Sequence, residues 1–205
     1  MAPRTRILVC AFGPFPGVPV NPSARLAQVL GRTRRPALGA IDLIVEILPT
    51  RWDALGRLVV LLERHAPDAV LLLGVAPRRS VLCVETRAVN AAADRPDVAY
   101  RHPRARRIDP DAPANLRTTA RIAPLVAAAR AAGAAARSSR DAGRYLCNAS
   151  YFQALAWAAA HPAKPPPVVF VHVPGRQARP RREDPILARA VAALLVTLHT
   201  QSRRP

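Results

Sequence analysis

Three side chains have the types and surroundings needed for nucleophilic catalysis. Cys147 follows a predicted turn at 141–143 and opens an apolar stretch with helical character. The N–H groups and dipole at a helix N-terminus stabilise a thiolate and can hold an oxyanion. His172 ends an apolar run, where it could take a thiol proton and return it to a leaving amine. Glu85 lies in a mostly apolar segment and could orient an imidazole.

Each of these side chains also has a purely structural interpretation. Cys147 could be a small buried hydrophobe. His172 could be a hydrogen-bonded histidine of the core or of a loop. Glu85 could form an ion pair with Arg79, Arg87 or another arginine. The residues taken alone leave these alternatives open.

Metal, disulfide and nucleotide chemistry have little support. The cysteines are Cys10, Cys83 and Cys147, an odd number without a CxxC pair, which argues against a disulfide scaffold and a structural zinc site. Histidines and carboxylates show no metal-ligand spacing, and no glycine motif for phosphate is present. We therefore expect no metal and no organic cofactor. No apolar run approaches the roughly 18 residues that span a bilayer, so we expect a cytoplasmic protein without membrane contact.

The composition indicates one basic, globular domain. The chain has 205 residues, 50% of them hydrophobic, and a net charge of +18. That length suits a single domain with a real core. Lys164 is the only lysine among 31 basic residues, which is typical of a GC-rich genome rather than of a nucleic-acid binder. We expect only non-specific attraction to polyanions at low salt.

Apolar runs and helical periodicity alternate along the chain. We expect strands at 7–12, 41–48, 70–73 and 168–171, and helices at 22–30, 51–65, 118–132, 146–160 and 185–201. This order predicts an α/β fold, a single-domain three-layer sandwich with a mostly parallel central sheet covered by helices on both faces. A further extended segment is expected at 80–89, and an Arg- and Pro-rich excursion at about 91–115. Ligands should bind in the loops after Phe12, Leu73 and Val171.

Several segments, in this order, resemble the pyroglutamyl peptidase I family. These pyrrolidone-carboxylate peptidases are cysteine peptidases that remove an N-terminal 5-oxoproline. The similarity covers the chain from about residue 6 to about residue 198. The matching segments are Ile7-Leu8-Val9-Cys10-Ala11-Phe12-Gly13-Pro14-Phe15, Val20-Asn21-Pro22-Ser23, Gly74 to Arg79, Glu85-Thr86-Arg87-Ala88-Val89-Asn90, Ala142-Gly143-Arg144-Tyr145-Leu146-Cys147-Asn148 and Phe170-Val171-His172-Val173-Pro174.

The resemblance implies roles for individual residues. Cys147 matches the nucleophile, His172 the general base and acid, and Glu85 the group that orients His172. The implied substrate-binding positions are Phe12, Phe15, Val75, Arg95, Tyr145 and Leu146, with the two phenylalanines packing around the lactam ring and Arg95 near the oxyanion. The resemblance also implies a peptide substrate with a blocked N-terminus, and association into homodimers or homotetramers.

The chain departs from the family pattern at positions 74–79. The family's loop runs Gly-Gln-Ala-Gly-Gly-Arg, whereas Val75, Pro77 and Arg78 stand here in place of the Gln and both inner glycines. Pro77 fixes φ and removes a donor, so we expect a different backbone in this loop.

Three further departures lie close to the matched motifs. The family's Asp-Ala-Arg-Ile-Pro-Asp-Asn is altered at 93–99, Arg144 replaces a small or uncharged residue, and Gly175 stands where an aromatic is common. Two alternatives therefore accompany the peptidase hypothesis. One is a divergent amidohydrolase with the same mechanism on another blocked N-terminus. The other is a catalytically weak homologue that binds polyanions.

Overall fold

The computed structural model describes residues 4–15, 17–33, 36–161, 163–175 and 180–203. Residue 16, within the loop expected at 13–22, lies outside the described residues. The strands are β1 (Thr5–Phe12), β2 (Ile41–Leu48), β3 (Ala69–Ala76), β4 (Leu82–Glu85), β5 (Arg87–Val89), β6 (Asn115–Arg117), β7 (Ala136–Ser139) and β8 (Val168–Pro174). The helices are α1 (Pro22–Arg32), the short 3₁₀ helix at Pro36–Leu38, α2 (Ala54–His65), α3 (Ile122–Ala131), α4 (Leu146–Ala159) and α5 (Pro180–Ser202).

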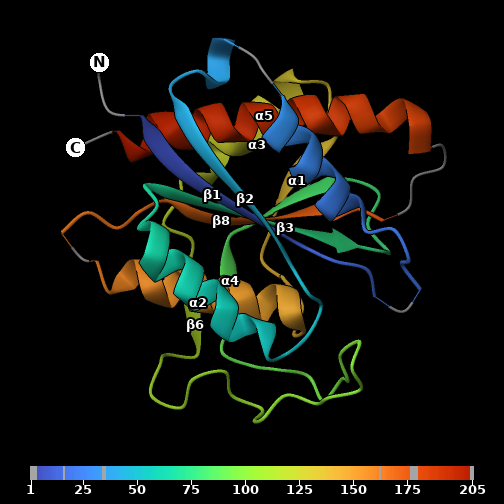
Figure 1. Ribbon diagram of the computed structural model, residues 1–205, viewed down its shortest axis with the longest axis vertical. Coiled ribbons are helices and arrows are strands. Elements are labelled where there is room, and N and C mark those ends of the chain that lie inside the picture. The colour runs from blue at the N-terminus through green and yellow to red at the C-terminus, as the bar shows by residue number, and fades with distance from the viewer. Residues whose placement is uncertain (1–3, 16, 34–35, 162, 176–179, 204–205) are drawn as a thin grey trace.

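Six strands form the central sheet in the order β2-β1-β3-β8-β4-β7. All neighbouring pairs are parallel except β4 and β8, which run antiparallel. Helices α1, α3 and α5 cover one face, and α2 and α4 cover the other (Figure 1). The predicted three-layer α/β sandwich with a mostly parallel sheet is therefore confirmed.

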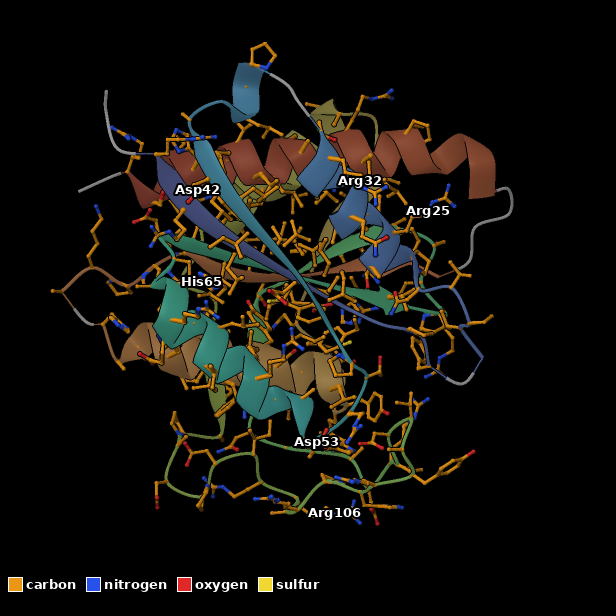
Figure 2. All side chains as sticks on the ribbon, viewed as in Figure 1. Arg25, Arg32, Asp42, Asp53, His65 and Arg106 are labelled. Atoms are coloured by element: carbon orange, nitrogen blue, oxygen red, sulfur yellow. The ribbon has the colours of Figure 1, made fainter. Side chains whose placement is uncertain are left out.

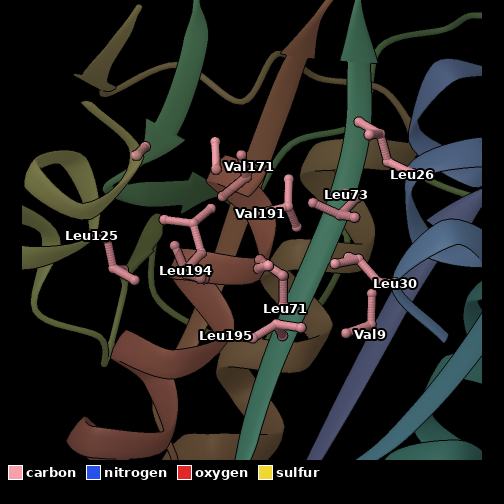
Figure 3. Packing of buried hydrophobic residues seen from close by; sticks show 14 of the residues in the cluster. Val9, Leu26, Leu30, Leu71, Leu73, Leu125, Val171, Val191, Leu194 and Leu195 are labelled. Atoms are coloured by element: carbon pink, nitrogen blue, oxygen red, sulfur yellow. The ribbon is translucent and has the colours of Figure 1, made fainter. Parts of the chain in front are cut away.

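The alternation of side chains along the strands creates a core on each face of the sheet. In β1, Val9 packs with α1 and α5, whereas Leu8 and Cys10 pack with α2 and α4. Figure 3 shows the first core, where Leu71 of β3 meets Leu195 of α5. Strands buried on both faces read as continuous apolar runs, which is why their sequences identified them.

Several elements differ from the sequence expectation. Helix α2 begins at Ala54 rather than 51, and α5 begins at Pro180 rather than 185. The extended segment at 80–89 divides into β4 in the main sheet and β5, which pairs with β6 in a separate two-stranded sheet. Strand β7 was not predicted because its half-exposed sequence lacks an apolar run. Helix α3 begins at Ile122 rather than 118, because the hydroxyls of Thr118 and Thr119 donate to the carbonyls of Val168 and Pro166 at the start of β8 and just before it.

The excursion between β5 and β6 is held by buried polar side chains. Asn90 donates to the carbonyls of Asp109 and Ala112 and accepts from two further N–H groups of the segment. Asn148 of α4 bonds both main-chain groups of Val89. The segment passes below α2 and α4 in Figure 1, and in Figure 2 its Arg106 lies near this end of the molecule.

None of the helices within the described ranges is both long enough and apolar enough to cross a membrane.

Helix α4 is the most enclosed of the helices that face the sheet, with ten buried residues from Leu146 to Ala158. A helix that is apolar on all sides must be covered on all sides. Its N-terminus is therefore fixed against the sheet, which matters for the site below.

Candidate active site

The antiparallel pairing of β4 with β8 brings Glu85 and His172 together. In this register, Cys83 lies opposite His172 and Glu85 lies opposite Phe170. The side chains of Glu85 and His172 both point to the face of the sheet that α4 covers. The ring Nδ1 of His172 lies 2.8 Å from Glu85 Oε1, and the two side chains are 6% and 0% exposed. A carboxylate at Nδ1 fixes the imidazole and leaves its other nitrogen free for proton transfer.

Cys147 is the second residue of α4. The helix begins at Leu146 with Tyr145 at the N-cap, and no cap side chain bonds its first N–H groups. These N–H groups have no partner within the helix, so they face the space next to the thiol. Cys147 is partly exposed, and it lines a cavity of about 270 Å³ together with His172.

Gly74 gives the Cys147 thiol its place against the sheet. It pairs with His172 in the register of β3 and β8. A Cβ at position 74 would lie 3.0 Å from Cys147 Sγ and 2.7 Å from Phe170 Cζ. Sequence analysis used this glycine only as the first residue of a segment that resembles the family, because the need for empty space arises from residues more than seventy positions away.

The cavity collects every predicted substrate-binding residue. Its lining includes Phe12, Phe15, Val75, Arg95, Tyr145 and Leu146. Glu85 is not part of the lining and lies behind His172. Phe12 and Leu146 are buried, and Phe15 is half-buried, so the inner part of the cavity is largely apolar. Such a surface suits a flat, weakly polar ring.

Tyr145 forms one wall of the cavity and is held by three contacts. The indole of Trp52 meets its ring edge to face, with centroids 5.3 Å apart. The guanidinium of Arg95 lies 4.7 Å above the ring, and the Tyr145 hydroxyl donates to the Pro96 carbonyl at 3.0 Å. Trp52 also donates from Nε1 to the Arg95 carbonyl. Sequence analysis gave Trp52 no part in the site.

Asp97 fastens this wall to the rest of the fold. Asp97 is buried, with 3% of its surface exposed. Its carboxylate accepts hydrogen bonds from the N–H groups of Trp52, Ala99 and Arg101. Burial acts to raise the pKa of Asp97, but the three N–H donors outweigh it and hold the pKa below its ordinary value. Sequence reasoning treated this residue only as part of an altered motif, since its partners lie up to 45 positions away.

Glu85 forms both an ion pair with an arginine and a contact with the His172 ring, which the sequence left as alternatives. Arg79 Nη1 lies 2.5 Å from the same oxygen that contacts His172, and Arg79 Nη2 donates to the Asp141 carbonyl. The ion pair and the His172 contact therefore coexist. The other oxygen, Oε2, is buried and has no hydrogen-bond partner among the described residues.

The Cys147 thiol is neutral in this arrangement. Burial, followed by the negative charge of Glu85, raises its pKa to about 12, and the thiol's own N–H and the charges of Arg79 and Arg95 oppose that shift. A nucleophilic thiolate must therefore be formed at the moment of attack, by transfer of the proton to a neighbouring base.

Pro77 and Gly175, two departures from the family pattern, lie against each other. A Cβ at Gly175 would lie 2.3 Å from Pro77 Cα and 2.9 Å from Pro77 N, and the Gly175 N–H donates to the Ala76 carbonyl. The loop that carries Pro77 thus lies directly against position 175. An aromatic residue at position 175 would not fit against this loop.

The described part of the chain holds no group of three His, Cys, Asp or Glu side chains that could bind a metal ion. The cavity brings together the Cys147 thiol and the His172 imidazole, with the Glu85 carboxylate behind the imidazole. With helix N–H groups beside the thiol, this set of groups can perform acyl transfer.

Known proteins with similar sequences share one description. Residues 5–197 match the family described as pyroglutamyl peptidase. A pyrrolidone-carboxylate peptidase of Gloeobacter violaceus is 35% identical over 173 residues, covering 82% of this chain and 81% of that protein. One of Deinococcus radiodurans is 36% identical over 174 residues, covering 84% and 79%.

Solved structures give the same result. A mutant pyrrolidone carboxyl peptidase from the hyperthermophile Pyrococcus furiosus superposes with a TM-score of 0.83 at 29% identity, covering 95% of this chain and 98% of that one. The pyrrolidone carboxyl peptidase from Thermococcus litoralis gives a TM-score of 0.82 at 27% identity, covering 96% of each chain.

Proposed function

The chain belongs to the pyroglutamyl peptidase family of cysteine peptidases, and on this premise we propose that Cys147, His172 and Glu85 are its catalytic triad. Hydrolysis of the amide bond after an N-terminal pyroglutamyl residue is the activity of this family of enzymes. The observation that carries the assignment is the Glu85–His172 contact of 2.8 Å beside the cavity that also receives the Cys147 thiol.

In the proposed acylation step, Cys147 Sγ attacks the carbonyl carbon of the pyroglutamyl residue. The thiol proton passes to the free ring nitrogen of His172, and the resulting oxyanion accepts hydrogen bonds from the N–H groups at 146–148. Glu85 stabilises the imidazolium through Nδ1. The C–N bond then breaks as His172 gives its proton to the departing amine, which leaves a thioester on Cys147.

Deacylation reverses these roles. His172 takes a proton from water, and the hydroxide attacks the thioester carbonyl. The C–S bond breaks, the thiol regains the proton from His172, and pyroglutamate leaves. Since the Cys147 thiol starts each cycle in its neutral form, both half-reactions depend on the orientation of His172.

The cavity supports a lactam ring as the bound group. Phe12, Phe15 and Val75 offer an apolar lining of suitable size for a small ring without charge. A ring such as proline has no lactam N–H or C=O, so any polar group of the site that bonds the lactam would be left unpaired. Each such group costs about 1–3 kcal/mol, which favours pyroglutamyl over proline.

The test uses a pyroglutamyl fluorogenic amide under reducing conditions. Wild-type protein should release the fluorophore. Cys147→Ser should abolish turnover with unchanged circular dichroism, and Cys10→Ala, at a cysteine outside the cavity, should keep activity. A folded protein that leaves this substrate intact overturns the assignment. If it instead cleaves another blocked amide through Cys147, the alternative amidohydrolase is correct.

We also propose a cytoplasmic location and self-association as a homodimer or homotetramer. A reducing compartment keeps the Cys147 thiol in the form that the mechanism needs. Association rests on the family resemblance alone. Light scattering on the purified chain should give a mass that is two or four times that of the monomer, and a monomeric mass at micromolar concentration would contradict it.

A further inference from the structure

A second cavity adjoins the candidate active site. It has a volume of about 450 Å³ and is lined by Arg87, Arg140 and Arg144. Residues 141–143 line both cavities and separate them. Because they share these residues, the two cavities lie next to each other. The Arg79 side chain donates a hydrogen bond to the Asp141 carbonyl in this shared segment. A peptide that extends outward from the thiol therefore meets the surfaces of both.

The two cavities together are strongly cationic. Six arginines line them, and Asp141 is the single carboxylate in their linings. Asp141 already accepts the N–H of Gly143. Arg79 is engaged by Glu85, but Arg78, Arg140 and Arg144 form no ion pair with any carboxylate of the described residues.

Three other described carboxylates are engaged elsewhere. Asp53 pairs with Arg51 and Arg101, and Asp94 pairs with Arg106 and contacts His102. Asp97 is buried under three N–H donors. Within the described residues, Asp141 is therefore the one carboxylate that lines either cavity, and it forms no ion pair with the arginines there.

The cleft thus has two chemically different parts. The inner part is apolar and suits the uncharged pyroglutamyl ring. The arginines at the exposed rim have no charge on that ring to recognise. The residue after the scissile bond must lie beside the thiol and leave through the exposed rim, so it is the part of the substrate that comes closest to these charges.

We propose that Arg78 and Arg144 make the enzyme selective for substrates with a carboxylate on the residue directly after the pyroglutamyl group. The inference rests on the proposed function of the same site. That carboxylate is either an Asp or Glu side chain or the free α-carboxylate of a pyroglutamyl dipeptide. Both positions are departures from the family pattern, so the selectivity is a property of this chain.

The expected preference is moderate and sensitive to salt. One exposed charge pair changes an equilibrium by at most about fivefold, so two arginines should favour an acidic substrate by about 5- to 10-fold in kcat/KM. Because the Debye length falls to about 3 Å at 1 M salt, the preference should shrink strongly at high ionic strength.

The experiment measures kcat/KM by competition between amidated peptides pGlu-X-Ala with X as Asp, Asn or Lys. A second arm compares pGlu-Ala with its amide, which isolates the α-carboxylate. The expected order is Asp, then Asn, then Lys, and the free dipeptide should exceed its amide. The double variant Arg78→Gln with Arg144→Gln should remove most of these differences, measured as ratios of kcat/KM between peptides on the same enzyme.

Arg64→Gln is the matched control, because it removes the same charge from an exposed position on α2, outside both cavities. It should keep the full preference. Equal kcat/KM for the Asp, Asn and Lys peptides in the wild type overturns the inference and leaves the peptidase assignment standing. A preference that survives the double variant also overturns it. Failure to cleave even the Asn peptide and the neutral fluorogenic amide instead refutes the proposed function.

Discussion

The cleft is built from two regions that are held in different ways. The floor, which we propose is catalytic and call the catalytic floor, is formed by Gly74, Glu85, Cys147 and His172. It lies on paired strands and the first turn of α4. The outer wall, formed by Trp52, Arg95, Asp97 and Tyr145, lies on loops and at a helix cap, and is joined by hydrogen bonds and ring contacts.

This difference separates the demands of chemistry from those of binding. In the catalytic floor, sheet register and close packing set the distances between reacting groups, and a shift of about 1 Å can cost about a hundredfold in rate. In the outer wall, a few exposed or half-buried contacts shape the pocket, and a shift mainly changes how well substrate fits. Changes to the floor should therefore lower kcat, and changes to the wall should raise KM.

Outside Cys147 and His172 themselves, the largest effect is expected for Gly74→Ala. The added methyl would lie 3.0 Å from Cys147 Sγ and under 3.0 Å from the Phe170 ring, so the thiol or the strand must move. We expect kcat to fall by about 10²- to 10³-fold, with a loss of about 1–3 kcal/mol in the free energy of unfolding.

Gly56→Ala is the control for that substitution. Its added Cβ meets nothing within 4 Å, and position 56 lies in α2, where alanine is the better helix former. Activity should be unchanged and stability equal or higher. If Gly74→Ala kept normal kcat in a steady-state assay, close packing of the catalytic floor would not control the chemistry.

Glu85→Gln should come next, with kcat lower by about a hundredfold. The amide still occupies the space of the carboxylate, but it does not stabilise the imidazolium of His172 and it leaves Arg79 without its anionic partner. KM should change little because Glu85 does not line the cavity. Steady-state kinetics that showed only a higher KM would place Glu85 outside the chemistry.

Asp97→Asn should have a smaller effect, confined to binding. The amide retains one acceptor oxygen, so at least one of the bonds to Trp52, Ala99 and Arg101 is weakened or lost. We expect KM to rise about 5- to 10-fold with kcat within about twofold of wild type. A drop in kcat at constant KM would contradict the separation of wall and floor.

The lowered pKa of Asp97 also gives a direction for acid stability. A carboxyl whose pKa is lower in the folded state stabilises the fold above its unfolded pKa of about 4. This contribution is lost as the pH falls through the folded value, so the difference in Tm between wild type and Asp97→Asn should narrow below about pH 4. A difference that widened in acid would contradict the assigned interactions.

Alkylation of Cys147 offers a smaller but specific test of the floor. Since burial and the charge of Glu85 hold the pKa of the thiol well above its ordinary value, labelling by iodoacetamide should keep rising as the pH increases past 9. Glu85→Gln removes one of the two causes, so it should speed labelling at pH 8 by a few-fold although it slows turnover. Labelling that is fast and constant from pH 6 to 9 would indicate a preformed thiolate instead.

Much of the catalytic floor could be predicted from the sequence, because Cys147, His172 and Glu85 each adjoin an element that is recognisable on its own. Buried strands and the α4 helix appear as continuous apolar runs, and the family resemblance placed the three residues in order. The sequence left open whether Glu85 forms an ion pair with an arginine or orients His172. In the fold, Glu85 contacts both Arg79 and His172.

The outer wall could not be predicted in the same way. Trp52 meets Asp97 and Tyr145 only because a long irregular segment returns to the start of α2. No local pattern encodes such a contact. The short strand β7 and the packing of Gly175 against Pro77 were also not predicted, since each depends on a neighbour far away in the chain.

The most direct test of the account is a double-mutant cycle on kcat/KM with Cys147→Ala, His172→Ala and the combined variant, each checked for folding by circular dichroism. If thiol and imidazole act as one unit, each single variant loses about 10³-fold or more and the combined variant is no worse than either. Losses that multiply in the combined variant would mean that the two groups act independently, and the proposed triad would be wrong.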